Sequence, residues 1–178
     1  MWNGACMARI DAHAIVVDAG PLIHLHELDC LDLLADLSPL IAPDPVWVEV
    51  RRHRPHMEHE SIRGFQIVSA DCTSSPQLAV LADTLDLAAG ETSALALAER
   101  YGLRTFLTDD AAARLAGESL GLRVHGTVGI LVRSISRGLR SRDEVVAILR
   151  TIRERSTLHI AGDLLAEVIE RVMADQSI

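Results

Sequence analysis

Short apolar runs that alternate with helical segments constrain the fold of this chain most strongly. Residues 14–18 form a β-branched run without polar alternation, which is typical of a buried parallel strand. Further strands are expected at 40–42, 104–108 and 122–124, and the segment 65–69 is either a strand or a loop edge. Strands that alternate with helices imply a central, mainly parallel sheet with helices on both faces, a three-layer α/β/α fold.

Prolines, glycines and capping residues mark the expected helices between these strands. A short helical turn begins at Pro21, and a helix over 28–37 would place Leu28, Leu31, Leu34 and Ala35 on one face. Further helices are predicted at 43–53, 76–86, 90–101, 110–120, 127–137, 141–153 and 162–173. We expect an N-terminal extension (1–12), an α/β domain (13–140) and C-terminal helices (141–178) packed on that domain.

The overall composition limits the classes of function. A length of 178 residues suits one domain, and a net charge of −8 argues against broad, nonspecific attraction to nucleic acid. The three cysteines, Cys6, Cys30 and Cys72, form no close pair and are read as reduced thiols. The N-terminus lacks a secretory signal, and no run approaches the ~18 apolar residues of a membrane span. We therefore predict a cytoplasmic protein without membrane contact.

Five carboxylates lie where strands end and helices begin. Asp18 ends the first strand, Asp109 and Asp110 follow the strand at 104–108, and Glu91 opens a helix after Gly90. Parallel sheets bind ligands outside the carboxyl ends of their strands. These acids, together with Glu49, are therefore predicted to share one pocket.

Each acid also has a purely structural interpretation. Asp18 or one of the pair Asp109 and Asp110 could cap a helix, and the helix dipole favours Glu91 in a first turn. Glu49 is harder to explain in this way, because helical spacing places it on an inward face. That face also carries Val46, Val50 and His53, and a salt bridge to Arg51 or Arg52 is the alternative for Glu49.

Taken together, the acids are better explained by hard divalent cations. Carboxylates gathered in one pocket repel each other unless protons or cations neutralise them. Mg²⁺ and Mn²⁺ prefer oxygen ligands, and such ions can activate water for an in-line phosphoryl displacement. The Thr108 hydroxyl could hold a metal-bound water, or it could be an ordinary strand residue. The pattern predicts a metal-dependent hydrolase.

Four motifs in this order resemble the PIN-domain family. They read Val-Val-Asp18-Ala-Gly-Pro-Leu-Ile, Pro-Asp-Pro-Val-Trp-Val-Glu49-Val, Gly90-Glu91-Thr-Ser-Ala-Leu and Thr-Phe-Leu-Thr108-Asp109-Asp110. The similarity covers roughly residues 13–173 and is greatest to the subgroup with a Gly-Glu motif, many of whose members are VapC-type toxins. The chain departs from the family at Glu91, where many members have Asp, and at Ala19, where many have Ser or Thr.

The resemblance implies a PIN-like fold and a Mg²⁺- or Mn²⁺-dependent endoribonuclease. It implies that the acids Asp18, Glu49, Glu91, Asp109 and Asp110 are catalytic. Metal ligands would be Asp18, Glu91 and Asp110, with the choice between Asp109 and Asp110 left open. It further implies an RNA substrate, a homodimer and a cognate antitoxin protein.

Arg133, Arg137 and Arg140 fall at helical spacing on one stripe. Arginine suits phosphate contacts, so the stripe is a candidate RNA-binding surface together with Thr108. The alternative is a solvated face or a set of ion pairs with acids of a partner.

The sequence thus predicts an endoribonuclease that hydrolyses RNA phosphodiester bonds, the toxin of a toxin–antitoxin pair. Two alternatives stay open: a nuclease of the same fold in RNA processing, and a non-catalytic protein-binding module with an acidic cleft. A phosphatase of another α/β fold fits less well, because no second Asp follows closely after Asp18.

Overall fold

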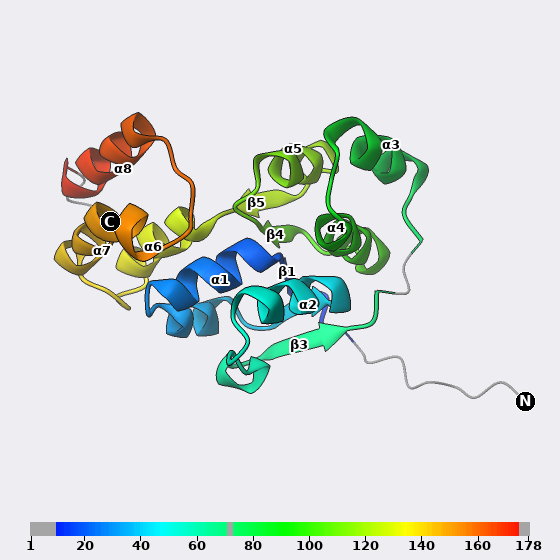
Figure 1. Cartoon of the computed structure of the whole chain (residues 1–178), viewed down its shortest axis with the longest axis horizontal. Helices are drawn as coiled ribbons and strands as arrows, with labels where there is room; N and C mark the ends of the chain where they lie inside the picture. The colour runs from blue at the N-terminus through cyan, green and yellow to red at the C-terminus, as the bar shows by residue number, and fades with distance from the viewer. Residues whose placement is uncertain (1–9, 71–72, 175–178) are drawn as a thin grey trace, which may run out of the picture.

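A computed structural model of the chain describes residues 10–70 and 73–174 (Figure 1). Five parallel strands form one sheet in the order β3-β2-β1-β4-β5. The strands are β1 (Ile15–Val17), β2 (Leu40–Pro43), β3 (Phe65–Val68), β4 (Thr105–Leu107) and β5 (Arg123–His125). Helices flank the sheet, which confirms the predicted three-layer α/β/α architecture.

The helices occupy most of the predicted ranges. They are α1 (Ala19–Glu27), η1 (Leu31–Leu37), α2 (Asp44–His53), η2 (His59–Ser61), α3 (Pro76–Leu85), α4 (Ala89–Tyr101), α5 (Ala111–Ser119), α6 (Thr127–Ser136), α7 (Arg142–Arg155) and α8 (Gly162–Ala174). Helix α4 packs on β1, β2 and β4 and contacts α2, α3 and α5. Helix α6 contacts α1, η1 and α7, and the three helices α6 to α8 gather at one end of the molecule (Figure 1).

The winding direction of the sheet reverses between β1 and β4. The chain passes from β1 to β2 and β3 on one side, then returns to the other side of β1 for β4 and β5. In the β1–β4 pair, Val16 lies opposite Phe106 and Val17 opposite Leu107. The carboxyl ends of β1 and β4 are therefore neighbours at a topological switch point, where open α/β sheets bind their ligands.

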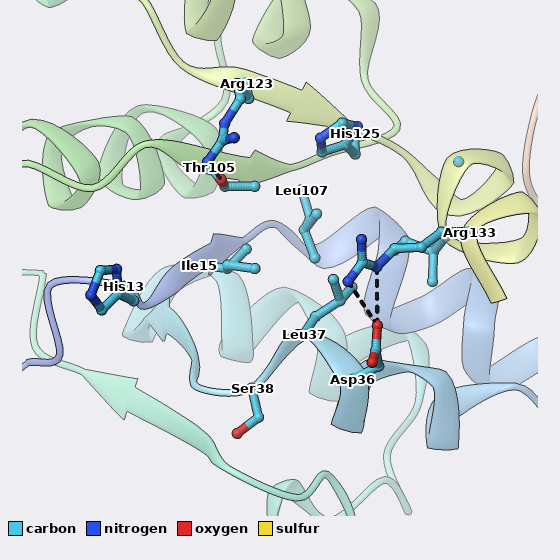
Figure 2. A pocket seen from close by; sticks show the side chains of 12 residues that line it. His13, Ile15, Asp36, Leu37, Ser38, Thr105, Leu107, Arg123, His125 and Arg133 are labelled. Carbon is cyan, nitrogen blue, oxygen red and sulfur yellow. Dashed lines mark hydrogen bonds and ion pairs between the residues drawn. The ribbon is translucent and has the colours of Figure 1, made fainter. Parts of the chain in front are cut away.

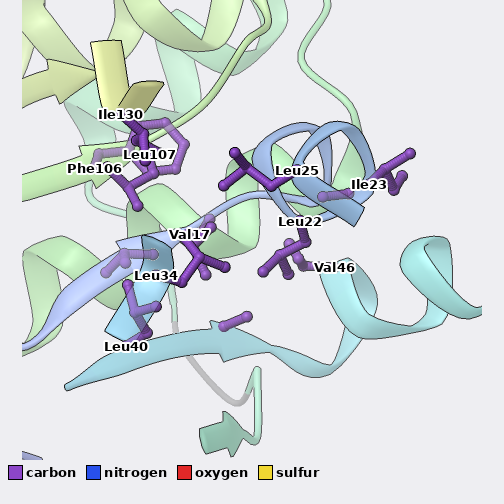
Figure 3. Close-up of a cluster of buried hydrophobic side chains, with 14 of the residues drawn as sticks. Val17, Leu22, Ile23, Leu25, Leu34, Leu40, Val46, Phe106, Leu107 and Ile130 are labelled. Carbon is purple, nitrogen blue, oxygen red and sulfur yellow. The ribbon is translucent and has the colours of Figure 1, made fainter. Parts of the chain in front are cut away.

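A continuous apolar core holds these strand ends in place. Figure 3 shows helix side chains packed against side chains of the strands. Those of the helices are Leu22, Leu25, Leu34, Val46 and Ile130, and those of the strands are Val17, Leu40 and Leu107. Full burial of one such side chain stabilises the fold by about 1.5–3 kcal/mol. The core thus fixes the positions from which the site residues project.

The predicted single helix over 28–37 is wrong. Leu28 instead ends α1, Asp29 has a φ of 57°, and the chain then continues as the 3-10 helix η1. A residue with left-handed backbone dihedrals cannot continue a right-handed α-helix, so the helical segment is interrupted at Asp29. Consequently Ala35, which was expected on the inner face, is exposed. The turn predicted at Pro21 is correspondingly longer and forms all of α1.

Within the described residues, no helix combines the length and apolar character needed to cross a bilayer. Cys30 is a buried free thiol, whereas Cys6 and Cys72 lie outside the described residues. Most of the expected N-terminal extension, residues 1–9, lies outside them as well.

The Ser75 side chain caps α3 and contacts Glu99 of α4, so its replacement should change the stability of the fold. Its Oγ accepts a hydrogen bond from Leu78 N (3.1 Å) and donates to Glu99 Oε1 (2.8 Å), whose other oxygen is buried without a partner among the described residues. Ser75→Ala should therefore lower the free energy of unfolding by about 1–2 kcal/mol, as for a lost helix cap. Urea denaturation measures this, and the exposed neighbour Ser74→Ala is the matched control, expected to change little. Equal stability of both variants would contradict the expectation.

Candidate metal-binding active site

Asp18 lies buried at the switch point, directly after β1. Its backbone N–H donates to Leu107 O (2.8 Å), which extends the pairing of β1 with β4 by one residue. Its side chain accepts a hydrogen bond from the Thr108 hydroxyl (Oγ1 to Oδ2, 3.0 Å). Asp18 is only 5% exposed and Thr108 is fully buried. We therefore expect Thr108 to act by orienting Asp18 and not by touching RNA.

Glu49 and Glu91 approach the same region from helices α2 and α4. A Cβ atom placed on Gly90 would lie 3.4 Å from Glu49 Oε2 and 3.5 Å from a methyl group of Val46. A glycine at this position thus lets the start of α4 lie close to the Glu49 carboxylate. On the helix face that carries Glu49, Val46 and Val50 are buried as predicted. His53, at the end of α2, is exposed, contrary to the prediction.

Glu91 is both a helix-capping residue and part of this acidic region. Its Oε2 accepts a hydrogen bond from Ala88 N (2.8 Å), which is the Glu half of a capping box. Ala88 has no side-chain acceptor to provide the other half. Glu91 thus lies in the first turn of α4, as predicted, and this structural role does not remove the carboxylate from its acidic neighbours.

Asp109 and Asp110 have different surroundings. Asp110 caps α5, with its Oδ1 accepting from Ala113 N (2.8 Å), and its side chain is exposed. Asp109 instead accepts three hydrogen bonds: from Thr127 N (2.7 Å), Thr127 Oγ1 (2.6 Å) and His24 Nδ1 (2.8 Å). It thereby ties the end of β4 to α1 and to the start of α6.

Sequence reasoning did not identify His24 or Thr127 as partners of Asp109. Thr127 was expected only at the start of a helix, and His24 lies 85 positions from Asp109 along the chain. Only the fold brings them together.

The pKa values show which acids influence one another. Burial raises the pKa of Asp18 to about 7, and the charges of Glu91 and Glu49 add to the shift. Burial also raises the pKa of Glu91, with further contributions from Asp110 and Glu49. Four acids, Asp18, Glu49, Glu91 and Asp110, thus form one electrostatic group, which we call the acidic cluster.

The donor set of the acidic cluster fits a hard divalent cation. Within the described residues, no group of three or more His, Cys, Asp or Glu side chains is placed so that it could hold a metal ion. Mg²⁺, however, usually takes only one or two carboxylates and keeps several waters. A buried carboxylate such as that of Asp18, with a raised pKa and with Glu91 and Glu49 acting on it, is electrostatically unfavourable when ionised. A bound cation would remove that penalty.

The arginine stripe is paired within the chain. Arg133 and Arg137 both contact Asp36 at 2.9 Å, and Arg140 contacts Asp32 at 2.8 Å. These acids belong to η1 and not to a partner molecule. The guanidinium groups are therefore partly neutralised, and their contact with RNA stays a prediction.

A family model described as a PIN domain matches residues 14–174, which include every acid of the cluster. The comparison with curated proteins returns no match.

Proposed function

The chain belongs to the PIN-domain family, and from this premise we propose that it is a Mg²⁺- or Mn²⁺-dependent endoribonuclease. The PIN domain is a nuclease fold that generally depends on divalent metal ions. The observation that carries the proposal is the buried Asp18 carboxylate, with its pKa near 7, beside Glu91 and Glu49 at the switch point.

Distinct roles for the acids follow from their surroundings. Asp18, Glu91 and Asp110 would hold the metal ion, and Glu49 would be a further ligand or would orient water. When bound, the cation supplies an activated water and stabilises charge on the phosphate. Asp109 is bound on both oxygens by Thr127 and His24, so we assign it a positioning role. Of the two adjacent acids, this geometry favours Asp110 as the ligand.

Thr108 lies between two of the three proposed ligand residues. Its hydroxyl donates to the Asp18 carboxylate and accepts from the backbone N–H of Asp110 (3.1 Å), so one buried side chain contacts both residues. A hydroxyl with both hydrogen-bonding capacities used is held in a single orientation. The Thr108 N–H donates to His125 O (2.9 Å), which extends the pairing of β4 with β5 by one residue, so the strand register holds this hydroxyl beside Asp18.

We further propose that the chain is the toxin of a toxin–antitoxin pair, homodimeric and silenced by an antitoxin. This rests on the resemblance of the Gly90-Glu91 motif to VapC-type proteins. A nuclease of this fold in RNA processing is the alternative. Induced expression in a bacterial host separates them: growth arrest relieved by a co-expressed neighbouring small protein supports the toxin role. Unimpaired growth with active enzyme supports the alternative.

Cleavage of labelled RNA by the purified full-length protein tests the enzyme proposal. We expect internal cleavage with Mg²⁺ or Mn²⁺, loss of cleavage in excess EDTA, and recovery when Mn²⁺ is restored, because the metal supplies the activated water. A small phosphate ester serves as the control substrate and should stay intact. Undiminished cleavage in EDTA would exclude the metal mechanism. Absence of both cleavage and calorimetric Mn²⁺ binding would instead favour a protein-binding module.

A further inference from the structure

A hollow of about 400 Å³ lies between η1, α6 and the strands β1, β4 and β5 (Figure 2). None of the carboxylates of the acidic cluster lines it. Its volume falls in the range of about 300–1,000 Å³ found for small-molecule sites. It is therefore large enough to be a ligand site separate from the proposed active site.

The floor of this hollow is apolar. Ile15 of β1 and Leu107 of β4 lie beside Leu37 of η1 and Ile130 of α6. Gly129 of α6 also lines the space, and a Cβ added there would have only the Cβ atom of His125 within 4 Å, at 4.0 Å. The missing side chain leaves room above the floor for a flat apolar group.

The rim of the hollow is cationic. Figure 2 shows Arg123 and His125 on β5 and Arg133 on α6 around the opening. The acid Asp36 also lines it, but Asp36 already binds both Arg133 and Arg137. Within residues 10–70 and 73–174, Arg123 has no acidic partner and only a 3.5 Å contact with Thr105 Oγ1. The guanidinium group of Arg123 is thus available to an anion.

The pKa of His125 is lowered by burial and by the positive charges near this rim. These charges are those of Arg114, Arg123 and Arg133. Arg114 is anchored behind β5 by hydrogen bonds to Val124 O and Thr108 O, both 3.3 Å, so its charge is fixed there. Arg133 is paired with Asp36 and Arg114 contacts Glu118 at 4.0 Å, so among the three arginines Arg123 is the one whose charge an anionic ligand can use.

We propose that this hollow binds a nucleoside monophosphate, with the phosphate at Arg123 and the base on the apolar floor. Arginine binds phosphate through two parallel hydrogen bonds, and a planar base buries apolar surface in the remaining space. The site is distinct from the acidic cluster, so it stands independently of the nuclease proposal.

Calorimetric titration of the full-length protein with AMP in EDTA tests the proposal. We expect one AMP per chain, with adenosine and inorganic phosphate each binding at least about tenfold more weakly because each lacks one half of the recognised group. Asp18→Asn should bind AMP as the wild type does, because the acidic cluster is not part of this site.

Two variants locate the binding. Arg123→Gln should weaken AMP binding roughly tenfold through loss of the phosphate contact. Gly129→Leu should abolish binding by filling the hollow. The control is Arg171→Gln on α8, an exposed arginine paired only with Glu167 in the described chain, which should bind normally. Thermal unfolding verifies that each variant is folded.

Several results would overturn the proposal. They are no heat at millimolar AMP, unchanged affinity in both Arg123→Gln and Gly129→Leu, equal binding of adenosine, and loss of binding in Asp18→Asn. Because RNA cleavage is not the measurement, a failure here would leave the proposed nuclease activity unaffected.

Discussion

Replacement of Asp18 by asparagine is expected to reduce metal-dependent RNA cleavage roughly a thousandfold and to stabilise the metal-free protein. The loss of activity follows because a metal ion contributes several kcal/mol of charge stabilisation to phosphoryl transfer, and each 1.36 kcal/mol is about tenfold in rate. The gain in stability follows because asparagine is neutral and nearly isosteric. Its side-chain oxygen can still accept the hydrogen bond from Thr108.

The stability difference should depend on pH in a defined direction. Below pH 3.8, Asp18 is protonated in both the folded and the unfolded chain, so the wild type and Asp18→Asn should be similarly stable. As the pH rises toward 7, the unfolded chain releases this proton while the folded protein retains it. The wild type therefore loses stability relative to the variant, up to about 4 kcal/mol at pH 8.

Denaturant unfolding in EDTA at pH 4 and pH 8 measures this difference. Asp83→Asn, at an exposed aspartate of α3, is the matched control and should show no pH-dependent gain. Added Mn²⁺ should stabilise the wild type at pH 8 but not Asp18→Asn, because binding to the folded state alone raises stability. Wild-type cleavage rates in the Asp18→Asn protein would contradict the metal-ligand role.

Replacement of Asp109 by alanine is expected to lower the free energy of unfolding by roughly 2–5 kcal/mol. Three hydrogen bonds would be lost, and the N–H and hydroxyl of Thr127, whose side chain is fully buried, would lose their acceptor. The connection of β4 to α1 and α6 would be weakened with them. Chemical denaturation at neutral pH measures the loss.

Asp110→Asn is the matched variant at the next residue. Asparagine is also a good helix N-cap, so the Ala113 N–H keeps its acceptor and stability should change by less than about 1 kcal/mol. Cleavage should nevertheless fall strongly in Asp110→Asn if this acid is a metal ligand. A stable Asp109→Ala protein without activity, together with a fully active Asp110→Asn, would reverse the assignment of the two acids.

Much of the architecture could be predicted from local chemistry. The sequence predicted that a helix starts at Ser75-Pro76 and that helices end at Gly102 and Gly121. The structure places these helix ends within a few residues of the predicted positions. The error at residues 28–37 has a physical cause. Leucine spacing is compatible with one helix, but Asp29 takes a left-handed conformation that closes α1, and no turn signal in the sequence marks it.

The amino-acid sequence by itself determined the alternation of strands and helices, and with it the parallel sheet, because hydrophobic periodicity and capping act over a few residues. It also placed acids after β1 and β4, where a parallel sheet exposes its carboxyl ends. Only the tertiary structure decided which acids influence one another, since burial and Coulomb interactions depend on distances between α2, α4 and the strand ends. For the same reason, only the fold distinguished Asp109, held by His24 and Thr127, from its neighbour Asp110.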